Sequence, residues 1–157
     1  KDPSSRHAVV SAWDPASDGL GGVQKKNVPC PFLFTVNIIG GRLHLHLVVR
    51  SNDMILGHPH DVGGFAFLTH ILAQNLKVNP GILTVTISNA HVYDIHYGAT
   101  GELIKRQHQH KNIHLTLPPR ALERAEKKDH KLVRDVVKNL ADQYQPGEAI
   151  QGLKIVL

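Results

Sequence analysis

The sequence contains one residue type that can act as a strong nucleophile at neutral pH, namely cysteine. Cys30 is the only cysteine of the sequence, and it lies between Pro29 and an apolar run. It is therefore either an inert buried thiol or a thiolate nucleophile that attacks an electrophilic carbon. Which of the two applies depends on the local context of the thiol.

Histidine is abundant, and this raises metal binding as an alternative. The sequence has 12 histidines, and three His-x-His pairs occur among them: His44/His46, His58/His60 and His108/His110. Residues i and i+2 of a strand share a face, but no cysteine or carboxylate stands beside these pairs at a zinc-site spacing. The glycines of GHPHDVGGF match neither a phosphate loop nor a dinucleotide fingerprint. We therefore expect hydrogen-bonded or solvent-facing histidines and no metal.

Composition restricts the possible partners. The 157 residues carry a formal charge of +5, which favours anionic partners such as nucleotides, nucleic acid or polyanionic cofactors. Aromatic residues make up only 5%, so a base-stacking nucleic-acid platform is disfavoured. No apolar run approaches the roughly 18 residues of a membrane span, and no signal-peptide core is present. We expect one cytoplasmic domain, over residues 1–157, that binds no membrane.

The hydrophobic pattern places these residues on a sheet and one apolar helix. Alternating apolar residues predict a hairpin, with strands over 30–39 and 42–50 and a turn at Gly40-Gly41. Asp61 would cap a largely buried helix over 62–76, in which two glycines allow close packing. A turn at 79–81 and a strand pattern over 82–97 follow. Further elements are expected as a loop or short helix over 98–112, a strand at 113–118, a helix over 119–142 and a strand at 151–157. This mixture predicts an α+β domain.

Four motifs in fixed register then carry a resemblance. They are PC at 29–30, RSND at 50–53, LGHPHD at 56–61 and HVYDIH at 91–96, and SRHAVVSAW at 5–13 adds a fifth segment. Together they resemble thymidylate synthase and its pyrimidine hydroxymethylase relatives over nearly the whole chain. The resemblance implies a mixed sheet packed with helices and a homodimer formed through the sheet. It also implies that the chain corresponds to the C-terminal part of such an enzyme, whose N-terminal half holds the general acid/base glutamate.

The resemblance assigns a role to each matching residue. Cys30 would add to C6 of a pyrimidine nucleoside monophosphate and so make C5 nucleophilic. Arg50 and Ser51 would bind the phosphate, and Arg6 would reach the phosphate held by the partner subunit. His91 and Tyr93 would contact the sugar hydroxyl. Asp53 and Gly57 would contact the pterin of the folate.

Asp61 carries the prediction of the base. Thymidylate synthases have Asn at this position, whose amide pairs with both N3–H and O4 of uracil. A carboxyl group instead accepts from the 4-amino group of cytosine and shares a proton with N3, which is the pattern of the deoxycytidylate hydroxymethylase branch. The alternative is that Asp61 serves only as a helix N-cap.

Departures from the family pattern favour hydroxymethylation over methylation. Pro31 follows the nucleophile where His is usual, Thr35 and Val49 replace glutamines, and Asn89 replaces an Asp. We expect a CMP or dCMP hydroxymethylase that uses 5,10-methylenetetrahydrofolate and in which water resolves the Cys30–C6 adduct. The alternatives are a thymidylate synthase or uridylate methyltransferase, a catalytically incomplete nucleotide-binding subunit, and a basic nucleic-acid-binding module.

Overall fold

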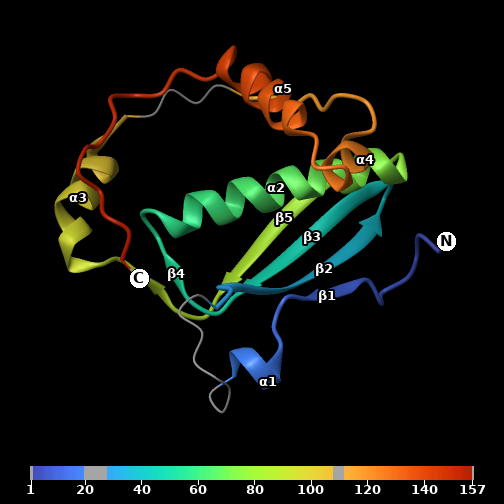
Figure 1. Cartoon of the computed structure of the whole chain (residues 1–157), viewed down its shortest axis with the longest axis horizontal. Coiled ribbons are helices and arrows are strands. Elements are labelled where there is room, and N and C mark those ends of the chain that lie inside the picture. The colour runs from blue at the N-terminus through green and yellow to red at the C-terminus, as the bar shows by residue number, and fades with distance from the viewer. Residues whose placement is uncertain (1, 20–27, 108–111, 157) are drawn as a thin grey trace.

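The protein is built on a four-stranded mixed sheet with one long helix across its face. The computed structural model describes residues 2–19, 28–107 and 112–156. The strand order is β1-β2-β3-β5, and the green helix α2 lies over the sheet in Figure 1. The bounds are Val9–Ser11 for β1, Pro31–Ile39 for β2, Arg42–Val49 for β3, Asn79–Ile87 for β5 and Gly57–Leu76 for α2. The predicted α+β fold, a mixed sheet packed with helices, is confirmed.

The hairpin of β2 and β3 forms as predicted. The turn residues Gly40 and Gly41 have φ of 56° and 72°, a conformation that glycine adopts without steric cost. The antiparallel register runs from Ile39 opposite Arg42 to Pro31 opposite Val49. Alternate residues of β3 point into the protein, and Leu43, Leu45, Leu47 and Val49 are at most 1% exposed. Leu45, Leu47 and Val49 of this row form the base of the core under α2.

Strand β5 runs parallel to β3, and α2 belongs to the connection between them. The register pairs Arg42 with Asn79 and Val49 with Ile87. The predicted turn at residues 79–81 is wrong, because these residues begin β5. A Cβ at Gly81 would lie 2.7 Å from the Leu43 carbonyl oxygen, so glycine here permits the close approach of the two strands.

Helix α2 begins earlier than predicted and is less buried. Its N-terminal residue is Gly57 rather than residue 62, and Pro59 fits because a proline in the first turn breaks no intrahelical hydrogen bond. Asp61 therefore lies inside the helix, and Leu56 occupies the N-cap position without a side-chain cap. Among the described residues only three of α2 are buried, and a Cβ at Gly63 or Gly64 would meet nothing within 4 Å. The close packing predicted for these glycines is therefore absent.

A second core joins α2 to the helices near the C-terminus. Residues 119–142 form two helices, α4 (Ala121–Glu126) and α5 (His130–Ala141), instead of the single helix predicted. Lys128 between them has φ of 54°, and Asp129 caps α5 by accepting from the Lys131 amide. Ile71 of α2 packs with residues of α4 and α5 in this core.

Two predicted strands do not form in the described part of the chain. Residues 113–118 and 151–156 lie outside regular structure. Side-chain amides bind the first segment: Asn139 accepts from the Thr116 amide, and Gln143 both accepts from and donates to the backbone of His114. Its backbone is therefore paired without a neighbouring strand.

The remaining elements are short. They are α1 (Pro15–Asp18), β4 (Asn52–Asp53), β6 (Ala90–His91), the 3-10 helix η1 (Asp94–His96) and α3 (Tyr97–Lys105). Residues 20–27, between α1 and β2, lie outside the described residues. Within the described chain, no helix has both the length and the apolar character needed to cross a membrane.

Candidate active site

The topology brings the predicted site residues, with the exception of Arg6, to one end of the sheet. β2 begins where its antiparallel partner β3 ends, so Cys30 and Arg50 flank the Pro31–Val49 pair. β5 ends beside β3, since Val49 pairs with Ile87, and the chain then continues into β6. β4 and the first turn of α2 follow directly after β3, as the left side of Figure 1 shows. Three segments distant in sequence thus meet at this end.

Arg50 holds the backbone around Cys30. Its amide donates to the Cys30 carbonyl over 2.9 Å, and its Nε and Nη2 each donate over 3.0 Å to the carbonyls of Pro29 and Val28. The guanidinium carbon lies 5.8 Å from the centre of the Trp13 ring, which is cation–π geometry. A guanidinium has five N–H donors, so three remain for an anion. Cys30 itself is half-buried and packs against the core under α2.

Asp61 is held by a buried amide. Asn52 of β4, 2% exposed, donates from Nδ2 to Asp61 Oδ2 over 2.7 Å. Its Oδ1 lies 2.8 Å from Nδ1 of His58. Asp61 is therefore not the N-cap proposed as its alternative role, because it lies within the helix and its carboxylate is bound by a side chain of another element.

The candidate sugar and folate residues are neighbours. β4 pairs in parallel with β6, so Asp53 lies opposite His91. The His91 and Tyr93 rings are in edge contact with centroids 5.0 Å apart, although Tyr93 follows the strand instead of belonging to it. Asp53 Oδ1 accepts from the Ile55 amide over 2.9 Å. A Cβ at Gly57 would lie 3.6 Å from Cβ of Asp53, so these two predicted folate residues are adjacent.

Two predicted residues are less constrained. Ser51 is half-buried between Arg50 and Asn52. Arg6 is exposed and precedes the edge strand β1, so its role toward a partner's phosphate stays a prediction.

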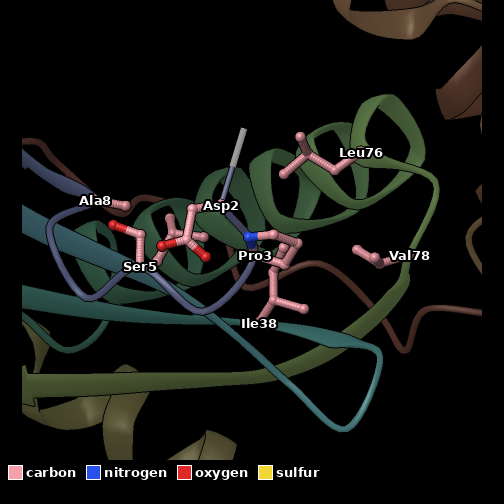
Figure 2. Close-up of a pocket in the computed structure, with 8 residues that line it drawn as sticks. Asp2, Pro3, Ser5, Ala8, Ile38, Leu76 and Val78 are labelled. Carbon is pink, nitrogen blue, oxygen red and sulfur yellow. The ribbon is translucent and has the colours of Figure 1, made fainter.

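A hollow of about 350 Å³ contains none of the predicted site residues (Figure 2). It lies between the N-terminal segment, represented by Asp2, and the ends of β2 and α2, represented by Ile38 and Leu76. Cys30 and Gly57 lie at the opposite ends of those two elements. This hollow is therefore separate from the candidate site.

Sequence reasoning missed three polar residues of this region. Asn52 and His58 lie within the RSND and LGHPHD motifs, but no role was assigned to them. His96, 1% exposed, has Nε2 3.0 Å from the Lys154 carbonyl oxygen, and its ring contacts Tyr93. Nδ1 of His96 is buried without a hydrogen-bond partner among the described residues. The available signal was that all three residues lie within the motifs at 50–53, 56–61 and 91–96.

The described histidines of the His-x-His pairs have hydrogen-bond contacts. His46 Nε2 lies 2.8 Å from Thr86 Oγ1, and His44 Nδ1 accepts from the Ile82 amide. His60 Nδ1 lies 2.6 Å from the Leu56 carbonyl oxygen. The pair His108/His110 lies outside the described residues. Among the described residues, no group of three potential ligands is placed to hold a metal ion.

Comparison with known proteins identifies the family of the chain. The model of the family described as thymidylate synthase matches residues 1–152. The chain belongs to the thymidylate synthase family. A thymidylate synthase from Haloferax volcanii is 37% identical over 93 residues, a match that covers 59% of this chain and 26% of that protein. The match thus spans about a quarter of the length of the Haloferax volcanii protein.

Proposed function

We propose that the chain forms the nucleotide-activating part of a CMP or dCMP C5-hydroxymethyltransferase that uses 5,10-methylenetetrahydrofolate. The thymidylate synthase family binds a pyrimidine nucleotide and uses this folate as co-substrate. The observation that supports cytosine is the side chain of Asp61, an acceptor-only carboxylate whose Oδ2 is already bound by Asn52. It offers an acceptor to the 4-amino group of cytosine, whereas it would repel O4 of uracil.

Cys30 supplies the nucleophile in this proposal. A sulfur–carbon bond forms at C6, and the electron pair of the C5–C6 double bond becomes available at C5. Loss of the C5 proton and departure of the Cys30 thiolate later restore the ring. Arg50 serves this step in two ways: it fixes the backbone of residues 28–30, and its remaining N–H donors suit the phosphate. His91 and Tyr93 would orient the sugar.

Asp53 and Gly57 fit a folate. Asp53 Oδ1 is bound by the Ile55 amide, and its carboxylate can accept further hydrogen bonds from pterin N–H groups. Gly57 beside it has no side chain to obstruct a flat ring. When bound, methylenetetrahydrofolate supplies the one-carbon unit at the oxidation level of formaldehyde. Water in place of hydride would then give the hydroxymethyl product.

A homodimer through the sheet belongs to the same proposal. Parallel strands are normally covered on both faces, yet β3 and β5 are covered by α2 on one face. His46, Thr84 and Thr86 on the other face are exposed in the single chain. Sedimentation should give a dimer, and Thr86→Arg should shift it toward monomer. A wild-type monomer at micromolar concentration would contradict this part.

Thymidylate synthase activity is the second candidate, and the name of the Haloferax volcanii relative favours it. Product analysis in isotopically labelled water separates the two. The proposal predicts 5-hydroxymethyl-CMP or 5-hydroxymethyl-dCMP carrying the label, whereas a methylated uracil nucleotide without label would establish the alternative. Tight nucleotide binding with no product would support an incomplete binding subunit. Binding to nucleic acid alone, with steep salt dependence, would refute both enzymes.

A further inference from the structure

The amide of Asn52 connects two side chains of the first turns of α2. His58 and Asp61 lie three residues apart on the helix, so they share a face. Asn52 reaches both from β4, with distances of 2.8 Å to His58 Nδ1 and 2.7 Å to Asp61 Oδ2. The amide is 2% exposed, so water cannot readily replace either partner.

The chemistry of the three groups fixes their hydrogens. A carboxylate only accepts hydrogen bonds, so the Asn52 group facing Asp61 must be the NH2 group. Oδ1 of Asn52 then faces His58, and Nδ1 of His58 must carry a hydrogen. Reversing the amide would place its oxygen against the carboxylate and its NH2 against a ring N–H. His58 therefore supplies the second hydrogen bond of the Asn52 amide and helps to hold it in the orientation that Asp61 requires.

We propose that His58, acting through Asn52, is a positioning residue for the recognition of the base by Asp61. This inference rests on the proposed function. With Oδ2 held by an N–H donor, Asp61 presents Oδ1 to the pyrimidine as an acceptor, which matches an amino group at C4. Without the His58 N–H, the Asn52 amide keeps only one of these two hydrogen bonds, and its hold on Asp61 Oδ2 loosens. Oδ1 of Asp61 is then no longer held toward the amino group at C4, so the preference for cytosine over uracil weakens.

The test compares two variants of one residue in the whole chain. His58→Asn retains an N–H donor with the reach of Nδ1, whereas His58→Leu removes it. The ratio of the dissociation constants for CMP and UMP is measured by calorimetry. We expect the preference of His58→Leu for CMP to fall about tenfold, as for the loss of one hydrogen bond, and that of His58→Asn to stay near wild type. An unchanged ratio in His58→Leu overturns the inference.

Nitrogen NMR of the His58 ring supplies a second readout that is independent of nucleotide. The neutral ring should carry its proton on Nδ1, and a proton on Nε2 alone would overturn the inference. A wild-type chain that prefers uracil nucleotides, or that binds neither CMP nor dCMP, overturns the proposed function, and this is seen before any variant is made. Failure of the inference and failure of the function are thus distinguished.

Discussion

Replacing Asp61 by asparagine should reverse the base preference with little change in the fold. The substitution is isosteric, and the carbonyl oxygen of the new amide can still accept from Asn52 Nδ2, where Asp61 Oδ2 now accepts over 2.7 Å. A hydrogen bond to a charged group is replaced by a neutral one, so the free energy of unfolding should fall by about 1 kcal/mol. The NH2 group of the new amide then faces the base.

The change in preference follows from the pairing at C4. For a cytosine nucleotide, an NH2 group facing the 4-amino group leaves two donors unpaired, and for a uracil nucleotide the same group donates to O4. A buried mismatch costs roughly 1–3 kcal/mol. The variant loses affinity for the cytosine nucleotide and gains affinity for the uracil nucleotide. The difference between their binding free energies should therefore change by about 3 kcal/mol, or roughly a hundredfold in the ratio of dissociation constants. The assay is the ratio of dissociation constants for CMP and UMP, with kcat/KM where turnover is measurable.

Asp53→Asn is the matched control for this experiment. It makes the same chemical change in a half-buried carboxylate of the same region, whose recorded partner is the Ile55 amide. It should leave the base ratio unchanged and weaken folate binding. A base ratio in Asp61→Asn equal to that of wild type, in a variant that folds, would refute the assignment of Asp61 to the base.

Three further outcomes are expected. Cys30→Ser should abolish turnover while nucleotide affinity persists, and retained turnover would exclude Cys30 as the nucleophile. Leu47→Ala, at a side chain 0% exposed, should lower the free energy of unfolding in urea by about 2–5 kcal/mol. Ile39→Ala, 65% exposed, should lower it by less than about 0.5 kcal/mol, and equal losses would contradict the core assignment. Burial lowers the pKa of His70, so the unfolded chain binds this proton more readily. Stability should therefore be full above pH of about 6.5 and fall on acidification, and His70→Gln should show a weaker fall.

The sequence predicted the hairpin correctly because two local signals coincide there. Alternating leucines determine which face of β3 is buried, and Gly40-Gly41 supplies the positive φ of the turn. The predicted start of α2 at residue 62 is too late because glycine and proline, here Gly57 and Pro59, are residue types that commonly interrupt a helix. A helix tolerates both in its first turn, where amide hydrogens have no intrahelical acceptor.

In segment 113–118, the alternation of apolar and polar residues does not determine whether a strand forms. An apolar pattern predicts an extended chain, but it does not identify the groups that bind its backbone. Asn139 and Gln143 do so here, from a helix and the residues after it, without a neighbouring strand. The hydrogen bonds of Asn52 with His58 and Asp61 were missed for a related reason, because they depend on how the turn between β4 and α2 places these two elements.

The central claim is that Cys30 attacks a cytosine nucleotide, and C5 tritium release tests it most directly. The chain is incubated with C5-tritiated CMP, dCMP and dUMP in the presence of methylenetetrahydrofolate. The proposal predicts release from a cytosine nucleotide, none from dUMP, and none in Cys30→Ser. Release from dUMP alone, or from the Cys30→Ser variant, would contradict it.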